Sequence, residues 1–352
     1  MSSTRTVHAL AAFESEGDMK PWSYESRPLG PEDIEIEITH CGICGSDIHT
    51  IDSGWGATNY PLVPGHEIVG KVTEVGPDVN KFKVGDRVGV GAQVWACLNK
   101  DASKSCHECK VGMDALCSSI VATYNGKYRD GSLSYGGYAD YVCVIQDYAF
   151  TIPENIPSDE AAPLLCAGAT VYTPLKHEGV ESGDRVGVVG IGGLGHLAIQ
   201  FIAALGAIPV AFSRSSSKEK EVRALGAQEF IATDDKSQVE SASRSLDYLL
   251  ITADANGMPY DQYLGFLRPR GTCIMLGIPN DNITFRALSL ISPAVRLVGS
   301  LIGSINDIKE MLEVASVKNV RPVIQKMPMK QVNDGIALVR SGKVRYRVVL
   351  EN

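Results

Sequence analysis

The sequence predicts an α/β protein made of a β-rich domain and a doubly wound domain with a parallel sheet. The chain has 352 residues, which suits about two domains of roughly 100–200 residues each. Apolar and polar residues alternate over 34–39, 70–75 and 86–92, as they do in strands with one buried face. From about residue 157 onward, apolar strand-like runs alternate with helical segments, which is typical of βαβ units.

The two end segments differ from the middle of the chain. Up to about residue 157, Gly, Pro and Asn turn residues separate short alternating runs, which predicts many strands and few helices. From about Val298 the elements are mixed again, and the last part contains the apolar strand RYRVVLE at 345–351. Periodicity alone does not show onto which domain this tail folds.

The middle segment has the order of elements that a parallel sheet requires. A helix is predicted over 160–177, followed by an apolar strand at 185–190 and an Ala/Leu-rich helix at 194–206. The elements predicted after these are a strand at 208–213, a helix at 217–227, strands at 229–232 and 246–252, a helix at 259–267 and a strand at 271–277.

Composition excludes several classes of protein. The net charge of −8 argues against nonspecific nucleic-acid binding, which needs a basic surface. The chain lacks an uninterrupted apolar run of about 18 residues, so we expect no transmembrane helix. The first 20 residues lack the apolar core of a signal peptide. We therefore expect a cytoplasmic protein without membrane or nucleic-acid partners.

Four of the nine cysteines lie in one polar segment, CLNKDASKSCHECKVGMDALC, from Cys97 to Cys117. Disulfides, a metal site, a redox pair and chance are all open interpretations of such a cluster. Structural disulfides are rare in reducing cytosol, and an odd total fits poorly with a fully paired framework. Metal binding or chemistry is therefore favoured over disulfides.

A glycine loop follows the strand at 185–190. The run VGVVGIGGLGH places Gly190, Gly192 and Gly195 in a G-x-G-x-x-G pattern, with Gly193 between them, and a helix begins directly after it. Such glycines let the backbone approach a pyrophosphate at the N-terminus of the helix. Glycines also serve in simple turns, but the strand before and the helix after this loop favour dinucleotide binding.

The end of the next strand favours NADP over NAD. An NAD site usually offers Asp or Glu about 20 residues after the glycines, to bind the ribose 2′-hydroxyl. Here Ser213 and Arg214 occupy that place, and Lys218 adds a second cation. A cation with hydroxyls suits a 2′-phosphate. The alternative is a solvated turn in which a serine caps the following helix.

Three residues form a candidate catalytic metal site. Cys44, His66 and Cys166 would supply two thiolates and one imidazole, leaving the fourth position that a catalytic zinc keeps open. Each has a simpler alternative, because Cys166 on an apolar helix is more often just buried and His66 could belong to a turn. The spacing of the three residues leaves both interpretations open.

Several motifs together resemble one family. CGICGSDIH (41–49), PLVPGHEIVGKVTEVG (61–76), LLCAGATVYTPL (164–175), GIGGLGH (190–196) and GSLIGS (299–304) occur in the order typical of zinc-dependent medium-chain alcohol dehydrogenases. The closest resemblance is to the cinnamyl alcohol dehydrogenase branch and its broad-specificity NADP-dependent microbial relatives. It implies a GroES-like catalytic domain at 1–157 and 300–352, with a zinc lobe at 95–118. A Rossmann cofactor domain is implied at 158–299.

The resemblance implies roles for residues that match the motifs. Cys44, His66 and Cys166 match the ligands of the catalytic zinc, and Glu67 matches a carboxylate that exchanges with zinc-bound water. Asp47 matches the residue that orients the ligating histidine. Cys41 is not a family ligand, and we interpret it as structural.

The implied activity is hydride transfer between primary alcohols or aldehydes and NADP(H), with zinc as a Lewis acid. Ser46 and His49 match a relay that carries the substrate proton. Two alternatives stay open: reduction of conjugated C=C or C=N bonds on the same fold, and a cofactor-binding scaffold without activity. The Ser46–His49 pair favours carbonyl chemistry, and the complete ligand set argues against a scaffold.

On the cofactor side, the resemblance implies that Thr170, Gly277 and Ser300 lie near the nicotinamide half. It also implies Ser213, Arg214 and Lys218 at the 2′-phosphate. His196, directly after the last glycine of the loop, is interpreted as a packed helix residue.

The resemblance assigns the four cysteines Cys97, Cys106, Cys109 and Cys117 to a structural zinc, so two zinc ions per chain are expected. The usual spacing in this branch is C-x2-C-x2-C-x7-C, and the last two intervals match. Eight residues separate Cys97 from Cys106 instead of two, and we interpret the extra residues as flexible polar filler. His107 is the rival fourth ligand, although it adjoins Cys106.

The substrate pocket and the assembly are less specified. Ala122 stands where the plant lignin enzymes carry an aromatic residue, and Leu301 stands where they often have Phe. A less aromatic pocket favours broad use of aliphatic and aromatic aldehydes. The resemblance also implies a homodimer.

Overall fold

The computed structural model describes residues 4–352, which divide into two compact units. Unit 1 comprises the described part of Met1–Cys166, together with Ile302–Ser316 and Pro322–Asn352. Unit 2 comprises Ala167–Leu301 and Val317–Arg321. The catalytic role predicted for 1–157 and 300–352 and the cofactor-binding role predicted for 158–299 stay predictions.

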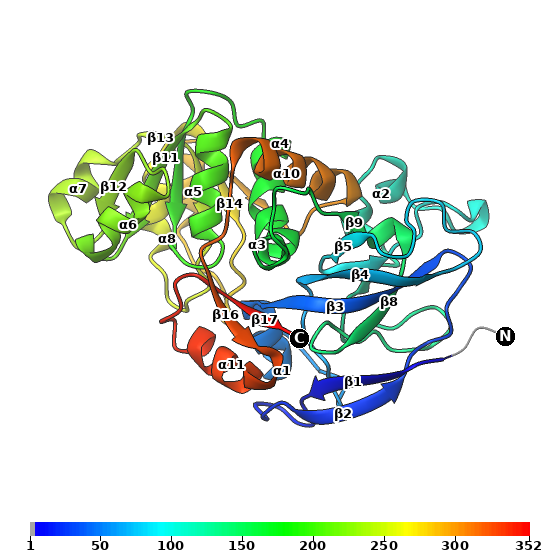
Figure 1. The fold of residues 1–352 in the computed structure, drawn as a ribbon. Helices are drawn as coiled ribbons and strands as arrows, with labels where there is room; N and C mark the ends of the chain where they lie inside the picture. Colours follow the sequence, from blue (N-terminus) through cyan, green and yellow to red (C-terminus); the bar gives the residue numbers. More distant parts are fainter. Residues whose placement is uncertain (1–3) are drawn as a thin grey trace. The chain divides into compact units, whose positions relative to one another are not determined.

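Unit 1 is built around a seven-stranded sheet with the order β16-β17-β3-β4-β5-β9, in which β8 also pairs with β3 (Figure 1). The long central strand β3 buries Ile34, Ile36 and Ile38, the residues that the alternating pattern assigns to one face. The strands of this sheet are β3 (Asp33–Ile43), β4 (Ile68–Val75), β5 (Arg87–Val90), β8 (Tyr141–Ile145), β9 (Phe150–Thr151), β16 (Ile324–Pro328) and β17 (Arg347–Glu351).

The C-terminal tail belongs to this sheet. Strand β17 lies antiparallel to β3, with Leu350 opposite Cys41, and β16 extends the sheet in parallel beyond it. The apolar run at 347–351 is therefore an inner strand that is paired on both sides. This pairing settles which sheet the tail joins, a point that periodicity could not decide.

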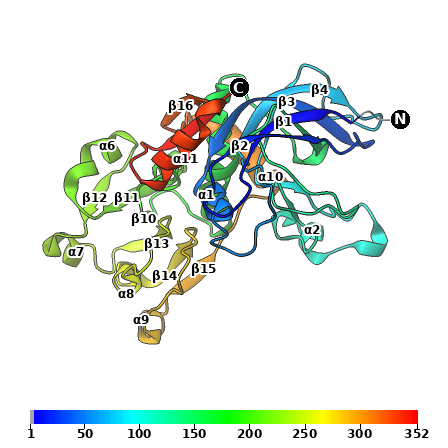
Figure 2. The same ribbon diagram turned by 90° about the horizontal axis from the view of Figure 1, so that it is seen from below.

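Short elements surround the sheet of unit 1 (Figure 2). Two small sheets pair β1 with β2 and β6 with β7. The bounds are β1 (Thr6–Ala11), β2 (Lys20–Glu25), β6 (Gln93–Trp95), β7 (Val121–Ala122), α1 (Gly45–Ile51), η1 (Ala102–Lys104), α2 (His107–Lys110), η2 (Asp114–Leu116), η3 (Gln146–Tyr148), α3 (Ser158–Pro163), η6 (Met329–Gln331) and α11 (Val332–Arg340). Helix α10 (Ile305–Lys318) belongs to unit 1 as far as Ser316, and its last two residues belong to unit 2.

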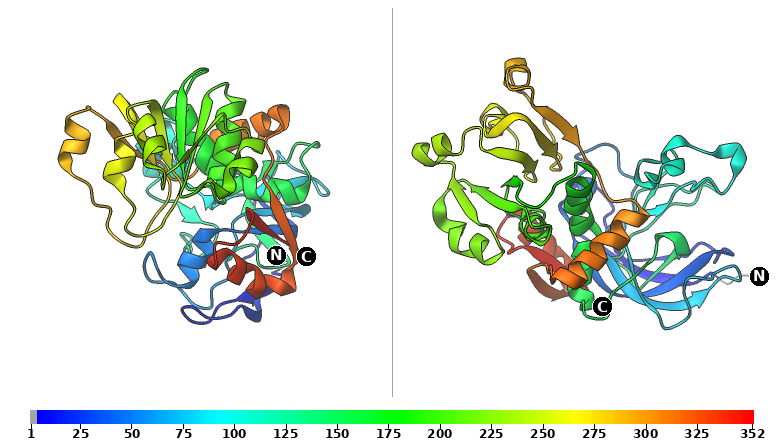
Figure 3. Two further views of the ribbon diagram at one scale, coloured as in Figure 1. Left: turned by 90° about the vertical axis from the view of Figure 1, so that its left-hand side faces the viewer. Right: turned by 90° about the horizontal axis from the view of Figure 1, so that it is seen from above.

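Unit 2 contains a six-stranded sheet with the order β12-β11-β10-β13-β14-β15, in which every pairing is parallel (Figure 3). This is the doubly wound arrangement predicted from the alternation of strands and helices. Its elements are α4 (Ala169–His177), β10 (Arg185–Val189), α5 (Gly195–Ala204), β11 (Ile208–Ser213), η5 (Ser216–Lys218), α6 (Glu219–Ala224), β12 (Glu229–Ala232), α7 (Lys236–Ser241), β13 (Leu246–Ile251), α8 (Tyr260–Leu264), β14 (Leu267–Met275), α9 (Ala287–Ile291) and β15 (Arg296–Gly299).

The helix predicted over 160–177 is not continuous. It ends at Pro163, and a π-helical turn, Leu164–Gly168, separates it from α4. A proline ring disturbs the regular helical hydrogen bonds, and π-helical turns are frequent at functional sites. Cys166 lies in this turn. Among residues 4–352, no helix combines the length and apolar character that crossing a bilayer requires.

Candidate active site and metal centres

Four candidate ligands lie together in unit 1, and we call them the Cys44 set: Cys44, His66, Glu67 and Cys166. One ligand atom from each lies within 4.8 Å of all the others, and all four residues are buried. Cys44 follows the end of β3, whereas His66 and Glu67 precede the start of β4. These strands are antiparallel, with Cys41 opposite Ile68, so the C-terminal end of β3 lies beside the N-terminal end of β4. The segments that carry the candidate ligands therefore meet at that end of the two strands.

The sulfur and imidazole groups of the Cys44 set are in direct contact. His66 Nε2 lies 3.0 Å from Cys166 Sγ, and the two sulfur atoms of Cys44 and Cys166 lie 3.8 Å apart without a disulfide. The hydrogen bond between the two thiols lowers the pKa of Cys44 well below its usual range and raises the pKa of Cys166 well above its own. A thiolate, a second sulfur and an imidazole nitrogen are the donors that zinc prefers.

Asp47 orients this set from helix α1. Its Oδ1 lies 3.2 Å from His66 Nδ1 and accepts the backbone N–H of Gly65 at 3.2 Å. Its Oδ2 accepts the backbone N–H of Cys44 at 2.8 Å. A carboxylate on Nδ1 fixes the ring so that Nε2 faces the other ligands, as is usual around metal-bound histidine.

Glu67 supplies a carboxylate with one atom free for a ligand. Its Oε1 accepts a hydrogen bond from the buried Arg347 of β17, whereas Oε2 is buried without a hydrogen-bond partner among the described residues. Burial raises the pKa of Glu67 to about 7, against the opposing effect of Arg347. An orphaned buried oxygen beside two sulfurs and a nitrogen fits a metal ion in this place.

The sequence interpretation missed Arg347. The sequence gives little indication of this role, because Arg347 is a single cation at the start of the apolar run RVVLE. A solvent-exposed arginine at the end of a strand would give the same pattern. The structure leaves it 5% exposed. Its position opposite Glu67 depends on the pairing of β17 with β3, which no local pattern reveals.

Ser46 and His49 lie three residues apart on α1, so they share one side of this short helix. The hydroxyl of Ser46 lies 3.6 Å from the sulfur of Cys44, which places it directly beside the ligand set. His49 stacks on Trp55, with ring centroids 4.4 Å apart. This arrangement suits a proton relay in which the Ser46 hydroxyl contacts the substrate and the His49 imidazole receives the proton from Ser46.

The structure also brings together the four-cysteine set, Cys97, Cys106, Cys109 and Cys117. Their sulfur atoms all lie within 4.8 Å of one another, and none of the four is in a disulfide. Backbone N–H groups of Cys109 and Ser119 point at the sulfurs of Cys106 and Cys117, at 3.3 and 3.4 Å. Four sulfurs with amide donors around them fit a closed structural zinc site. His107 is exposed on α2 and lies outside this set.

Two residues at the start of the insertion between Cys97 and Cys106 make specific contacts, whereas the flexibility that the sequence predicts for the insertion stays a prediction. Asn99 accepts the backbone N–H of Cys106 at 2.8 Å and donates to its carbonyl at 3.2 Å. Lys100 forms ion pairs of 2.6 Å with Glu32 and with Asp147. The contacts of Asn99 are local, whereas those of Lys100 join the insertion to residues that are distant in sequence.

The glycine loop of unit 2 has the geometry expected of a nucleotide loop. Gly190 has φ +95°, and a Cβ at Gly195 would lie 2.1 Å from the Gly190 carbonyl oxygen, so both positions require glycine. A Cβ at Gly192 would meet nothing within 4 Å. Close packing therefore explains the outer glycines, whereas Gly192 leaves open the space that a phosphate would fill. Gly193 lies in the turn before α5.

The other predicted cofactor residues follow the carboxyl ends of parallel strands. Ser213 ends β11, which neighbours β10, and Arg214 follows it as an exposed residue. Lys218 donates to the carbonyl of Ile191 in the glycine loop at 3.0 Å. Two further residues, Gly277 and Ser300, follow β14 and β15. The structure thus gathers these positions along one edge of the sheet.

Two residues of unit 2 lie on helices instead. Thr170 is buried on α4, which packs against α5. His196 is fully buried at the start of α5, and its Nδ1 lies 3.0 Å from the Gly192 carbonyl oxygen. The interpretation of His196 as a packed helix residue is confirmed.

Two family models match the chain. Residues 30–154 match the alcohol dehydrogenase GroES-like domain, and residues 193–316 match the zinc-binding dehydrogenase domain. The NADP-dependent alcohol dehydrogenase C 1 of Mycolicibacterium smegmatis is 40% identical over 348 residues, covering 98% of this chain and 98% of that protein.

Solved structures agree with these matches. A cinnamyl alcohol dehydrogenase from Sorghum bicolor superposes with a TM-score of 0.94 at 38% identity, covering 99% of this chain and 98% of that one. The CAD from Helicobacter pylori, complexed with NADP(H), superposes with a TM-score of 0.91 at 33% identity and covers 99% of both chains. The chain belongs to the zinc-dependent medium-chain alcohol dehydrogenases, in the cinnamyl alcohol dehydrogenase branch.

Proposed function

We propose that this protein is an NADP(H)-dependent zinc alcohol dehydrogenase that interconverts primary alcohols and aldehydes. The observation that carries the proposal is the buried Cys44 set, with two sulfurs, an imidazole and a carboxylate oxygen that lacks a hydrogen-bond partner among residues 4–352. The hydroxyl of Ser46 lies beside the sulfur of Cys44. Relatives at 40% and 38% identity are named as alcohol dehydrogenases, which supports this reaction class.

Each residue of the site has a distinct task in the proposed reaction. Cys44, His66 and Cys166 would hold a zinc ion, which, when bound, acts as a Lewis acid on the substrate oxygen. The hydride would come from NADPH or pass to NADP when the cofactor is bound. The Ser46 hydroxyl would exchange the substrate proton, and His49 would pass that proton on towards water. Asp47 keeps His66 in the orientation that the ligand set requires.

Cofactor choice is assigned to the end of β11. Ser213, Arg214 and Lys218 would bind a 2′-phosphate, because the segment AFSRSSSKEK has no acid until Glu219. The contact of Lys218 with Ile191 keeps this lysine near the glycine loop, which supports its assignment. A charged hydrogen bond is worth about 1.5–3 kcal/mol, so even one phosphate contact gives roughly tenfold discrimination or more.

A steady-state panel tests the proposal. Purified enzyme is assayed with aliphatic and aromatic aldehydes, with conjugated enals and with the matching alcohols, using NADPH and NADH in parallel. We expect aldehyde reduction with NADPH and kcat/KM at least about tenfold lower with NADH. Equal efficiency with NADH would overturn the cofactor assignment. Enal reduction only at the C=C bond would favour the reductase alternative, and no turnover at all would favour a scaffold.

Substrate breadth is proposed from two positions. Ala122 and Leu301 carry small or aliphatic side chains, and both are exposed in the structure. We infer that the enzyme accepts aliphatic, allylic and aromatic aldehydes without strict cinnamyl selectivity. Replacing Ala122 by Trp should raise kcat/KM for aromatic relative to aliphatic aldehydes; an unchanged ratio would show that Ala122 does not affect substrate choice.

We also propose two zinc ions per chain, a cytoplasmic location and a homodimer. Strand β15 is an edge strand of the unit 2 sheet, and Leu297 on it is exposed together with Leu288 and Ile291 of the neighbouring α9 segment. An open edge with exposed apolar residues suits pairing with a second copy. Light scattering should give twice the 37.8 kDa chain mass, and I291E should shift it towards the monomer.

A further inference from the structure

The segment Ser134–Tyr138, which we call the strap, is bound to the loop that carries His66. The backbone N–H groups of Gly136, Gly137 and Tyr138 donate to carbonyl oxygens of that loop at 2.8, 2.8 and 3.0 Å. The acceptors are Val63, Gly65 and Pro64, respectively. The strap is therefore paired directly with the residues that precede a candidate metal ligand.

Glycines on both sides allow this close approach. A Cβ at Gly136 would lie 2.4 Å from the Gly65 carbonyl oxygen. Gly65 has φ +99°, and a Cβ there would lie 2.6 Å from the Tyr138 ring. The ring of Tyr138 consequently rests on Gly65, where only glycine fits, and points its hydroxyl at Asp47.

The contact of Tyr138 with Asp47 is short and fully enclosed. The hydroxyl donates to Asp47 Oδ2 at 3.0 Å, and both residues are 0% exposed. Burial and the neighbouring carboxylate raise the pKa of Tyr138 well above its usual range, so the phenol remains a donor. The same carboxylate accepts from the Cys44 and Gly65 amides and faces His66 Nδ1.

We propose that Tyr138 is a positioning residue of the Cys44 set, which holds Asp47 so that His66 keeps its ligand orientation. This inference rests on the proposed zinc site. Tyr138 and the strap lie about 70 residues from the ligand loop in sequence, and nothing in GGYADY marks the tyrosine as more than a strand residue. Removing the hydroxyl would leave a buried carboxylate oxygen with one donor fewer.

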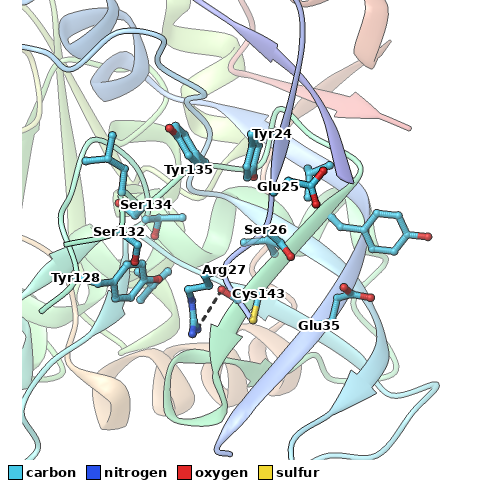
Figure 4. A pocket seen from close by; sticks show the side chains of 16 residues that line it. Tyr24, Glu25, Ser26, Arg27, Glu35, Tyr128, Ser132, Ser134, Tyr135 and Cys143 are labelled. Atoms are coloured by element: carbon cyan, nitrogen blue, oxygen red, sulfur yellow. Dashed lines mark hydrogen bonds between the residues drawn. The ribbon is translucent and has the colours of Figure 1, made fainter. Parts of the chain in front are cut away.

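The strap also supplies a matched control. Tyr135, three residues before Tyr138, lines a separate cavity of about 190 Å³ together with Tyr24, Arg27 and Cys143 (Figure 4). Its ring lies 4.4 Å from that of Tyr24. Y135F therefore changes a hydroxyl on the same segment, on the side of the cavity and not on the side of Asp47.

A second control matches the chemistry of the contact. The hydroxyl of Tyr148 donates to Asp114 at 3.1 Å, and Tyr148 is 2% exposed. Y148F removes a buried tyrosine–carboxylate bond of the same kind in the same unit. Any general loss of stability from such a deletion should therefore appear in Y148F as well.

The experiment measures zinc release from the intact enzyme to a chromophoric chelator. Wild-type protein should release two zinc ions in separable phases, and C44S should lack the phase that belongs to the Cys44 set. In Y138F that phase should be about 10–100-fold faster, whereas Y135F and Y148F should keep the wild-type rate. Thermal melting of Y138F and Y148F shows whether the two deletions are equally disruptive.

The outcomes separate the inference from the proposed function. Release at the wild-type rate in Y138F, or equal acceleration in Y138F and Y148F, would overturn the positioning role while leaving the zinc site in place. If wild-type protein and C44S release the same amount of zinc, the proposed function fails and this inference fails with it.

Discussion

The two candidate metal centres of unit 1 are built in opposite ways. The Cys44 set draws its members from three distant places in the sequence, and every member is buried. The four-cysteine set comes from one segment of 21 residues, and Cys106 and Cys109 remain partly exposed. Strand register assembles the first set, whereas local spacing and backbone amides assemble the second.

Their surroundings differ as well. Charged side chains adjoin the Cys44 set, since Asp47 faces His66 and Arg347 pairs with Glu67. Backbone N–H groups and the amide of Asn99 adjoin the four-cysteine set. A site that must bind and release an oxygen ligand needs tunable charge and an open position, whereas a structural site needs only closure. We therefore assign chemistry to the first and stability to the second.

The largest expected effect comes from breaking the Cys44 set. C44S should lower kcat for aldehyde reduction by at least about 1,000-fold, because losing Lewis-acid activation costs several kcal/mol in the transition state. NADPH affinity, measured by fluorescence titration, should change less than about threefold, because the glycine loop belongs to unit 2. C143S is the matched control, since Cys143 lies outside both ligand sets; it should keep full activity. Undiminished aldehyde reduction by C44S would refute the assignment.

Breaking the four-cysteine set should have a different result. C106S should reduce the zinc content from two ions to one and lower the melting temperature by several degrees, because a closed structural site contributes folding free energy. Turnover below the melting range should stay within about tenfold of wild type. A loss of turnover as large as that of C44S would show that the two centres do not have separate tasks.

A smaller effect is expected from the anchor within the insertion. N99A removes two contacts to the backbone of Cys106, so zinc release from the four-cysteine set should accelerate by about fivefold, equivalent to ~1 kcal/mol. N125A is the control, because Asn125 is another asparagine with positive φ in unit 1 and bonds Asn59 instead. Equal release rates in N99A and wild type would mean that the insertion does not support the metal site.

The smallest effect concerns the ion pairs of the insertion. Burial raises the pKa of Asp147, but hydrogen bonds from Lys100 and Lys81 outweigh it and the pKa is lowered. A depressed carboxyl pKa gives stability that is present above the unfolded value of about 3.9 and is lost as the pH falls through the folded value. K100M should therefore lower the free energy of unfolding by up to ~1 kcal/mol at pH 7, and this difference should shrink below about pH 4. If the stability difference between K100M and wild type grew on acidification, the lowered pKa of Asp147 could not be its cause.

Local patterns predict much of this molecule, and their limits are physical. Strand alternation, the glycine loop and the motif cysteines are local, so the sequence reveals them together with the parallel sheet. Arg347 and Tyr138 reach the Cys44 set only through the pairing of β17 with β3 and through the strap. The ion pairs of Lys100 likewise depend on distant partners, which no local pattern in the insertion reveals.

The most direct test of the proposed reaction follows the hydride itself. The enzyme is given cinnamaldehyde and NADPH in which deuterium replaces both hydrogens at C4 of the nicotinamide, and the product is analysed by NMR. We expect cinnamyl alcohol with one deuterium on the carbinol carbon and an intact double bond. Deuterium on the carbon β to the carbonyl, in a saturated aldehyde, would contradict it and identify the protein as a double-bond reductase.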